Sequence, residues 1–372
     1  MSVEGRMLRR AVSSALLILL IISILSLGVV PGTRLNEVSA SHECRLWGIT
    51  STSLSSYVVL NQLIYLPNSL KALGASNPNG WGLGFYNNTE PTVLRGQSAA
   101  NTDPNFDLAA SEVAGSGAII AVGHVRRASS GLVNIPDPHP FERYKDGKWW
   151  LFCHNGGIDK TILINLIGTE YLAQNPPSVG SNQGEWIDSE LYFIYILKCC
   201  EQSNWNVQEG ITKAIVGICN AVSGTGETLN FLLTDGQTLW GFSKGNTLYY
   251  YRDPQYLAIA SQYPTASHGA WMTVSDFYLV TLFRGNAPSV QRLCYSVTAL
   301  VKDSSTGRSV SQANVTLDGA YIGMTDSSGK LFLQAVAPGS HTLTVTKTGY
   351  YNAAASINVT SDVTATVRLK RK

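Results

Sequence analysis

The sequence has few charged residues and no cysteine pattern that would hold a metal. Asp, Glu, Lys and Arg make up 14% of its 372 residues, against roughly 25% in an ordinary soluble domain. The formal net charge is +2, and the only basic stripe is the terminal segment 368–372, so nucleic-acid binding is not expected. No two cysteines have the C-x-x-C spacing, which argues against a cysteine-ligated zinc ion. We therefore predict no metal and no other cofactor.

The chain has six cysteines, an even number that does not by itself predict disulfides. They are Cys44, Cys153, Cys199, Cys200, Cys219 and Cys294. If Cys44 is a nucleophile, at least one of the other five is unpaired within the chain. Cys199 and Cys200 are adjacent on a helical pattern, so we expect them to be buried rather than bridged. A disulfide between Cys44 and Cys153 is the main structural alternative for Cys44.

The first 43 residues have the pattern of an export or membrane segment. Arg6, Arg9 and Arg10 precede an apolar run at 11–30, which is just long enough to span a bilayer. The arginines should stay in the cytoplasm, so we expect the rest of the chain outside it, secreted or membrane-anchored at the cell surface. Small residues at 38–40 suit a signal peptidase; an uncleaved anchor is the alternative.

Residues 44–283 mix predicted strands and helices. The helices are expected at 59–73 (kinked or broken at Pro67), 190–200 and 207–222, and the strands at 46–50, 80–86, 118–125, 229–233, 238–242, 247–251, 256–261 and 278–283. The strand at 118–125 is almost continuously apolar and should be central in its sheet. This order suits two stacked sheets flanked by helices.

Residues 284–289 have the composition of a linker, and residues 290–372 differ in kind from what precedes them. Short alternating strands separated by Gly-rich turns predict a small β-sandwich there. The phrases at 323–329, 337–343 and 347–350 resemble carboxypeptidase-regulatory-like and PEGA surface modules. The resemblance implies no chemistry, and makes 290–372 a candidate for contact with a cell-surface partner.

Four short motifs suit the hydrolysis of an amide. They are Glu43-Cys44-Arg45, His124-Val125-Arg126, His154-Asn155-Gly156 and Asp188-Ser189-Glu190. A cysteine at a chain terminus can attack with its thiol and use its own α-amine, whose pKa is about 8, as the base. Asn155 and Gly156 could supply a side-chain amide and a backbone N–H to the oxyanion. Cys44 can use its amine only after the 43 residues before it are removed.

Four further residues are candidates for binding the substrate. Arg126 suits a carboxylate, because its planar guanidinium can bind one bidentately; Ser129 could add a hydroxyl. Asp188 suits an ammonium group, and a position at a helix start would help keep it ionised. His154 could line the pocket. The alternatives are that Arg126 is a surface arginine, Ser129 a loop serine, Asp188 an ordinary helix cap and His154 a structural histidine.

In this order the motifs resemble class II glutamine amidotransferases, whose nucleophile is an N-terminal cysteine. The matching phrases are at 44–48, 80–86, 123–126, 139–141, 154–156, 188–190 and 232–236. The resemblance implies an α+β, four-layer αββα N-terminal nucleophile hydrolase fold over residues 44–283 and a small-molecule substrate. It is strongest to the single-domain group that includes γ-glutamyl hydrolases of thiohistidine biosynthesis. That group usually has Asp at the position of Asn79 and often His at Asn77, so this chain departs from the group in a loop that the resemblance places near the substrate.

The sequence therefore predicts an exported amidohydrolase that cleaves the side-chain amide of glutamine or of a γ-glutamyl compound through a thioester. Residues 290–372 are too few and too β-like for a synthase domain, so hydrolysis is favoured over transfer of ammonia. Two alternatives stay open: the glutaminase subunit of a two-chain amidotransferase, and a catalytically silent cell-surface binding protein.

Overall fold

The computed structural model describes residues 43–128, 139–178, 180, 182–222 and 226–372. The predicted export or membrane segment at 11–30 and the candidate Ser129 lie outside these ranges. Within them, no helix is both long and apolar enough to cross a membrane.

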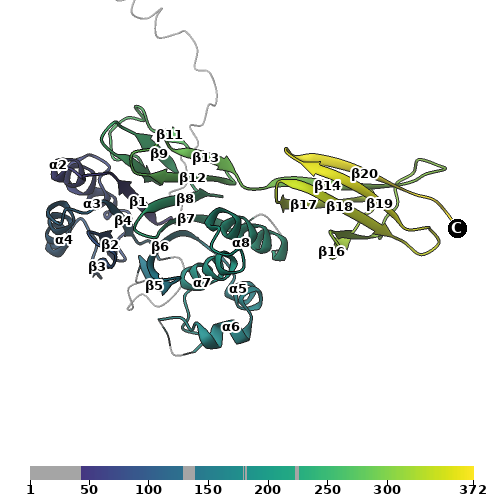
Figure 1. Cartoon of the computed structure of the whole chain (residues 1–372), viewed down its shortest axis with the longest axis horizontal. Coiled ribbons are helices and arrows are strands. Elements are labelled where there is room, and N and C mark those ends of the chain that lie inside the picture. Colours follow the sequence, from purple (N-terminus) through teal and green to yellow (C-terminus); the bar gives the residue numbers. More distant parts are fainter. Residues whose placement is uncertain (1–42, 129–138, 179, 181, 223–225) are drawn as a thin grey trace, which may run out of the picture. The chain divides into compact units, whose positions relative to one another are not determined.

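Residues 45–292 form two antiparallel sheets that stack face to face and carry helices on their outer faces (Figure 1). The seven-stranded sheet has the order β11 (Met272–Thr273), β9 (Tyr249–Arg252), β10 (Leu257–Ala260), β1 (Arg45–Thr50), β4 (Ile120–Val125), β2 (Trp81–Tyr86) and β3 (Pro91–Gly96). The six-stranded sheet has the order β13 (Ser289–Arg292), β12 (Tyr278–Phe283), β8 (Thr238–Ser243), β7 (Thr228–Thr234), β6 (Lys148–Gly157) and β5 (Phe141–Lys145).

Each sheet has its own helical layer. The seven-stranded sheet is covered by α2 (Ser56–Leu60), η1 (Asn61–Tyr65), α3 (Leu70–Leu73) and α4 (Pro104–Gly115). The six-stranded sheet is covered by α5 (Lys160–Ile167), α6 (Thr169–Gln174), α7 (Asp188–Glu201) and α8 (Val207–Ala221). The result is the four-layer αββα arrangement that the sequence predicted.

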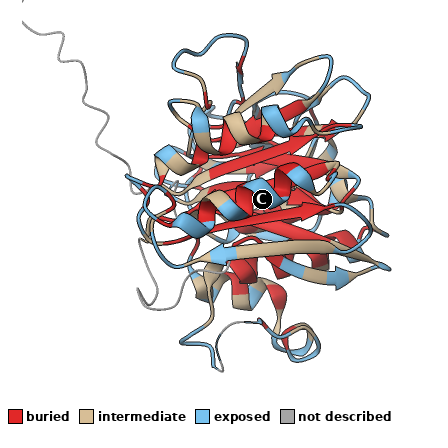
Figure 2. Cartoon of the chain, turned by 90° about the vertical axis from the view of Figure 1, so that its left-hand side faces the viewer, coloured by how far each residue is buried: buried red, intermediate tan, exposed pale blue. Residues whose placement is uncertain are grey.

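The alternation of side chains along the strands divides the core into three layers. Leu46 on β1 and Leu232 on β7 pack between the two sheets. Trp47, the neighbour of Leu46, packs on the opposite face among the helices α2 to α4, and Phe231 packs toward α7 and α8. Successive residues of a strand point to opposite faces of the sheet. Two residues of one strand have the same parity when they are separated by an even number of positions, and their side chains then enter the same layer. Figure 2 shows the buried strands and the exposed outer sides of the helices.

Most of the predicted elements are present. The strand expected at 118–125 is β4, which lies between β1 and β2 as a central strand should. The segment around Pro67 is broken into pieces, as one of the two alternatives predicted: η1 ends at Tyr65 and α3 begins at Leu70. The sequence did not predict α4, which starts with Asp103 accepting a hydrogen bond from the Asn105 amide.

The expected linker at 284–289 is shorter than predicted, and the first strand after it does not belong to the C-terminal module. Ser289–Arg292 forms β13 and pairs with β12 of the six-stranded sheet. The reason is local: residues 284–288 make a turn tight enough for the chain to fold back on β12.

The C-terminal residues form two further sheets around a core of their own. The three-stranded sheet contains β17 (Lys330–Val336), β14 (Tyr295–Asp303) and β20 (Val363–Leu369), and the four-stranded sheet contains β16 (Ala320–Met324), β15 (Asn314–Leu317), β18 (Gly339–Thr346) and β19 (Ala353–Val359). Inward residues of both sheets, such as Val301 and Leu343, are fully buried together. This is the small all-β unit that the sequence predicted.

Candidate active site

Cys44 lies just before β1, at one end of the space between the two sheets. It has the same parity as Leu46, so its side chain belongs on the face between the sheets. Its thiol lies 3.6 Å from the carbonyl oxygen of Arg127. Of the six cysteines, Cys44 alone is partly exposed, and none is joined in a disulfide.

The other cysteines lack the environment of a nucleophile. Cys153 is buried, and Cys199 and Cys200 are buried on α7 as predicted. Burial raises the pKa of the Cys200 thiol to about 12 and that of the Cys219 thiol to about 11. Because the thiolate is the attacking species, these thiols are inert at neutral pH.

Arg126 lies beside Cys44 on the neighbouring strand. Arg45 is opposite Val125 in the β1–β4 ladder, so Arg126, one residue beyond, faces the position of Cys44. The Arg126 amide donates to the carbonyl of Gly80 at 2.9 Å, and its carbonyl accepts from the Asn79 amide at 3.0 Å. The side chain is buried, as a residue that binds an enclosed carboxylate should be.

Asn155 brings an amide to the same layer from the other sheet. Leu151 and Cys153 of β6 pack between the sheets, and Asn155 continues that face. Its side chain is 0% exposed, and neither its Nδ2 nor its Oδ1 atom has a hydrogen-bond partner among the described residues. Buried polar groups are nearly always hydrogen-bonded, so this amide is in the state expected of a donor that awaits a ligand.

Close packing of two strands explains why position 156 is a glycine. Gly156 and Gly157 both lie in the extended strand β6. A Cβ atom at Gly156 would overlap the backbone carbonyl of Thr228 on β7. The glycine therefore permits close approach of β6 and β7 beside the candidate oxyanion site.

Three residues that the sequence analysis did not single out hold Asn155 in place. The side chain of Asn246 donates to the Asn155 carbonyl at 3.1 Å. Asn230, opposite Asn155 in the β6–β7 ladder, donates from its side chain to the Asn246 carbonyl at 2.8 Å. Asn230 is a polar residue within an otherwise apolar strand, which was the one signal in the sequence that could have revealed it.

The third residue, Ser261, ties this network to the strand of the nucleophile. Its hydroxyl accepts from the Leu46 amide at 2.8 Å, and its carbonyl accepts from the Thr247 hydroxyl at 2.9 Å. Thr247 follows Asn246 in the chain. These hydrogen bonds, joined through the peptide bond between Asn246 and Thr247, therefore connect β1, two residues from Cys44, with Asn155 on the other sheet.

Asp188 is the first residue of α7, where the sequence predicted a helix start. Its Oδ2 atom accepts a hydrogen bond from the Ile158 amide at 3.1 Å, which places the carboxylate next to the end of β6. The helix dipole favours its ionised form. Two residues on, the buried Glu190 accepts from the Arg143 guanidinium at 2.9 Å and from the Ser178 amide at 2.6 Å, fixing this end of α7.

His154 points away from Cys44. It has the opposite parity from Asn155, and its ring nitrogens lie 2.9 Å from the Ser189 hydroxyl and 3.1 Å from the Thr228 carbonyl. This arrangement matches the structural alternative for His154 and connects β6 with α7.

Two other histidines lie in the layer between the sheets. The rings of His124 and His139 stack with centroids 4.2 Å apart, and both residues are buried. Burial first, and then the nearby His154 and Arg126, holds the pKa of His139 well below its usual value. A neutral His139 adds no positive charge beside Arg126. Over the described residues, no group of His, Cys, Asp or Glu side chains is arranged to hold a metal ion.

The described residues thus define an αββα fold with a partly exposed cysteine beside the inner faces of its two sheets. Residues 46–262, more than half of the chain, match the family described as "Glutamine amidotransferases class-II". This protein belongs to that family. Residues 296–370 match the carboxypeptidase regulatory-like domain.

Individual relatives are more distant. The chain is 29% identical over 180 residues to the "Putative glutamine amidotransferase" of Haemophilus influenzae, covering 47% of this chain and 55% of that protein. It is 26% identical over 179 residues to "Putative glutamine amidotransferase YafJ" of Escherichia coli, covering 46% of this chain and 64% of that protein. The chain thus spans between about half and two thirds of the length of these relatives.

The fold is shared with a solved structure titled "Structure of the allosteric regulatory enzyme of purine biosynthesis". The TM-score is 0.50 at 16% identity, covering 67% of this chain and 49% of that one. At this identity the likeness shows the fold alone.

Proposed function

We propose that this chain is a cysteine amidohydrolase that converts glutamine or a γ-glutamyl compound to glutamate once residues 1–43 have been removed. The observation that carries the proposal is the Asn155 amide: it is fully buried, has no partner among the described residues, and shares the layer between the sheets with Cys44.

The reaction proceeds in two halves. The Cys44 thiol, deprotonated by the free α-amine of the same residue, attacks the side-chain carbonyl carbon of the substrate, and the carbonyl oxygen becomes an oxyanion bound by the Asn155 amide and the Gly156 N–H. The α-ammonium returns the proton to the leaving nitrogen, which departs as ammonia or an amine and leaves a thioester. Water, deprotonated by the same amine, then attacks the thioester carbonyl; the C–S bond breaks, glutamate is released, and the α-ammonium returns its proton to the Cys44 thiolate.

Arg126 and Asp188 recognise the amino-acid end of the substrate in this proposal. The Arg126 guanidinium, directly after β4, and the Asp188 carboxylate, at the start of α7, carry opposite charges and come from different layers of the fold. They would bind the α-carboxylate and the α-ammonium, respectively, and so place the side-chain amide at Cys44. Ser129 is proposed as a second donor to the carboxylate.

We also propose that the enzyme works outside the cytoplasm, where residues 290–372 contact a cell-surface partner. The support for export is the arginine patch and the apolar run at 11–30.

The test is to incubate purified protein with glutamine and with γ-glutamyl-p-nitroanilide, and to measure glutamate. We expect release of glutamate that is lost in Cys44→Ser and retained in Cys219→Ala, which removes a buried, inert thiol. Protein that begins at Cys44 but releases no glutamate from either compound would contradict the proposal.

A further inference from the structure

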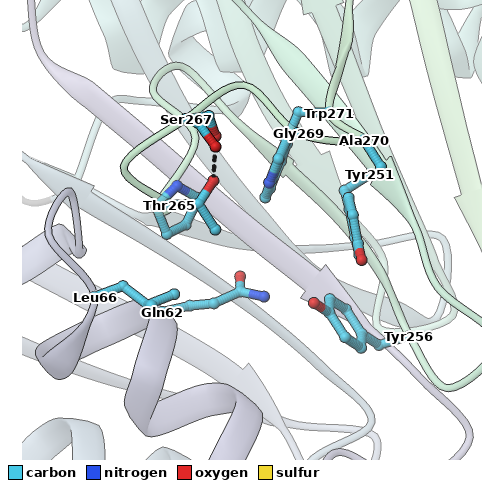
Figure 3. Close-up of a pocket in the computed structure, with 10 residues that line it drawn as sticks. Gln62, Leu66, Tyr251, Tyr256, Thr265, Ser267, Gly269, Ala270 and Trp271 are labelled. Carbon is cyan, nitrogen blue, oxygen red and sulfur yellow. Dashed lines mark hydrogen bonds between the residues drawn. The ribbon is translucent and has the colours of Figure 1, made fainter.

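A second concave site lies on the helix-covered side of the seven-stranded sheet, away from the layer that holds Cys44. Its volume is about 200 Å³, and Figure 3 shows its walls. The lining residues are Gln62, Leu66, Tyr251, Tyr256, Pro264, Thr265, Ser267, Gly269, Ala270 and Trp271. Ten residues line the site and none of them carries a charge.

Gln62 is placed in this site by an irregular helix. It belongs to the π-helical turn Asn61–Tyr65, and π-turns inside helices are frequent at functional sites. The side chain is buried, and its Oε1 atom accepts a hydrogen bond from the Trp47 indole at 2.8 Å. This bond fixes the orientation of the amide and directs its NH₂ group toward the cavity, where the hydroxyl of Tyr256 also points (Figure 3).

The opposite wall is aromatic. The rings of Tyr251 and Trp271 have centroids 5.3 Å apart, and those of Tyr251 and Tyr256 5.5 Å apart. Such rings offer flat apolar faces. The Tyr256 hydroxyl already interacts with the Gln62 amide and with Tyr251, so the three side chains form one polar group at the edge of the cavity.

The loop that closes the site is held in place. Asn68 donates from its backbone amide to the Pro264 carbonyl and from its side chain to the Thr265 carbonyl, both at 2.9 Å. The Thr265 hydroxyl donates to the Ser267 carbonyl at 2.7 Å. A preformed site loses less conformational entropy on binding than one that must be ordered by its ligand.

We propose that this cavity binds a neutral, hydroxylated ring, namely one pyranose unit of a carbohydrate. The uncharged lining disfavours an ion. The aromatic faces match the C–H face of a sugar ring, while the Gln62 amide and the Tyr251 and Tyr256 hydroxyls match its hydroxyl groups. A small cavity of this kind holds one ring, so an extended glycan would enter with a single unit. The inference does not depend on the proposed amidohydrolase activity.

The test uses ligand-observed NMR and calorimetry on the full-length protein, with methyl glucoside, methyl galactoside, methyl mannoside and N-acetylglucosamine as probes. We expect saturable binding of at least one probe, with a dissociation constant on the order of 1 mM. Tyr256→Phe removes one hydroxyl and keeps the shape of the wall, and should weaken binding about five-fold. Tyr144→Phe, on an exposed side chain of β5 outside the cavity, should leave it unchanged.

Three results would overturn the proposal. The first is that none of the four sugars shows saturable binding. The second is that the wild type and Tyr256→Phe bind the sugar with equal affinity. The third is that indole displaces the bound sugar at a concentration below that of the sugar. The last result would assign the site to a purely aromatic ligand. The melting temperature of each variant establishes that it is folded.

Discussion

The side-chain amide of Asn77 donates a hydrogen bond to the backbone carbonyl of Glu43 at 2.6 Å. This carbonyl belongs to the peptide bond that blocks the nitrogen of Cys44. The Glu43 carboxylate is held as well, by the Arg45 guanidinium at 3.1 Å. While Glu43 is attached, the nitrogen of Cys44 is an amide and cannot act as a base; removal of Glu43 would free the Cys44 amine and the Asn77 amide together.

Loss of either charged group that we propose to bind the substrate should cripple turnover of substrates with a free amino-acid end. We expect Arg126→Ala and Asp188→Asn each to cost about 2–5 kcal/mol of transition-state binding, because each leaves a substrate charge unpaired. The measurement is kcat/KM for glutamine. Arg127→Ala is the matched control, since it removes a neighbouring cation whose guanidinium donates to the Ser76 carbonyl at 3.2 Å. Equal losses in Arg126→Ala and Arg127→Ala would refute the assignment of Arg126.

The hydrogen bond that Asn246 donates to the Asn155 carbonyl should affect kcat. Asn246→Ala removes the hydrogen bond to the Asn155 carbonyl and should lower kcat about ten-fold with little change in KM, because the oxyanion exists only after attack. Asn182→Ala, which removes an exposed amide that bonds Glu185, is the control. A change in KM alone would show that Asn246 acts on substrate binding instead.

The buried ion pair of Glu190 and Arg143 should contribute far more to stability than an exposed pair. Glu190→Ala leaves Arg143 without its carboxylate and should lower the free energy of unfolding by about 3 kcal/mol. Glu209→Ala breaks the exposed pair with Lys213 on α8 and should cost about 0.5 kcal/mol. Urea unfolding of both variants measures the difference, and similar losses would contradict this account of Glu190.

The C-terminal module should weaken in acid through Asp303. The Thr306 backbone amide, and then the Arg371 guanidinium, hold the pKa of Asp303 below its usual value. Because the folded pKa is lower than the unfolded one, this stabilisation is present above about pH 4 and is lost as the pH falls through the folded value. Amide hydrogen exchange of β14 and β20, corrected for intrinsic rates and compared with β7, should show less protection at pH 3 than at pH 5. In Asp303→Asn this difference should shrink; an unchanged difference would exclude Asp303 as its source.

Local patterns were enough to predict the strands and helices that have strong periodicity. The apolar run ending at Val125 forms β4, and the helix expected at 190–200 is α7, which begins two residues earlier at Asp188. The strand Ser289–Arg292 was missed because no alternation of apolar residues marks it in the sequence. It is an edge strand with mostly exposed side chains, and its stability comes from pairing with β12.

The sequence pointed to the proposed reacting groups of the candidate site but not to the residues that support them. Cys44 and Asn155 stand out because their chemistry suits an amide reaction. Asn246 and Ser261 have side chains common in loops, and only the pairing of distant strands brings them to Asn155 and Leu46. The direction of His154 was likewise undetermined, because it depends on which face of β6 packs against α7.

The most direct test of the central claim is to determine the N-terminal residue of the active enzyme. Protein is separated into pools that do and do not hydrolyse glutamine, and each pool is examined by intact mass and N-terminal sequencing. The account predicts that every active molecule begins at Cys44 and that molecules retaining Glu43 are inactive. Full turnover by protein that still carries Glu43 would contradict it.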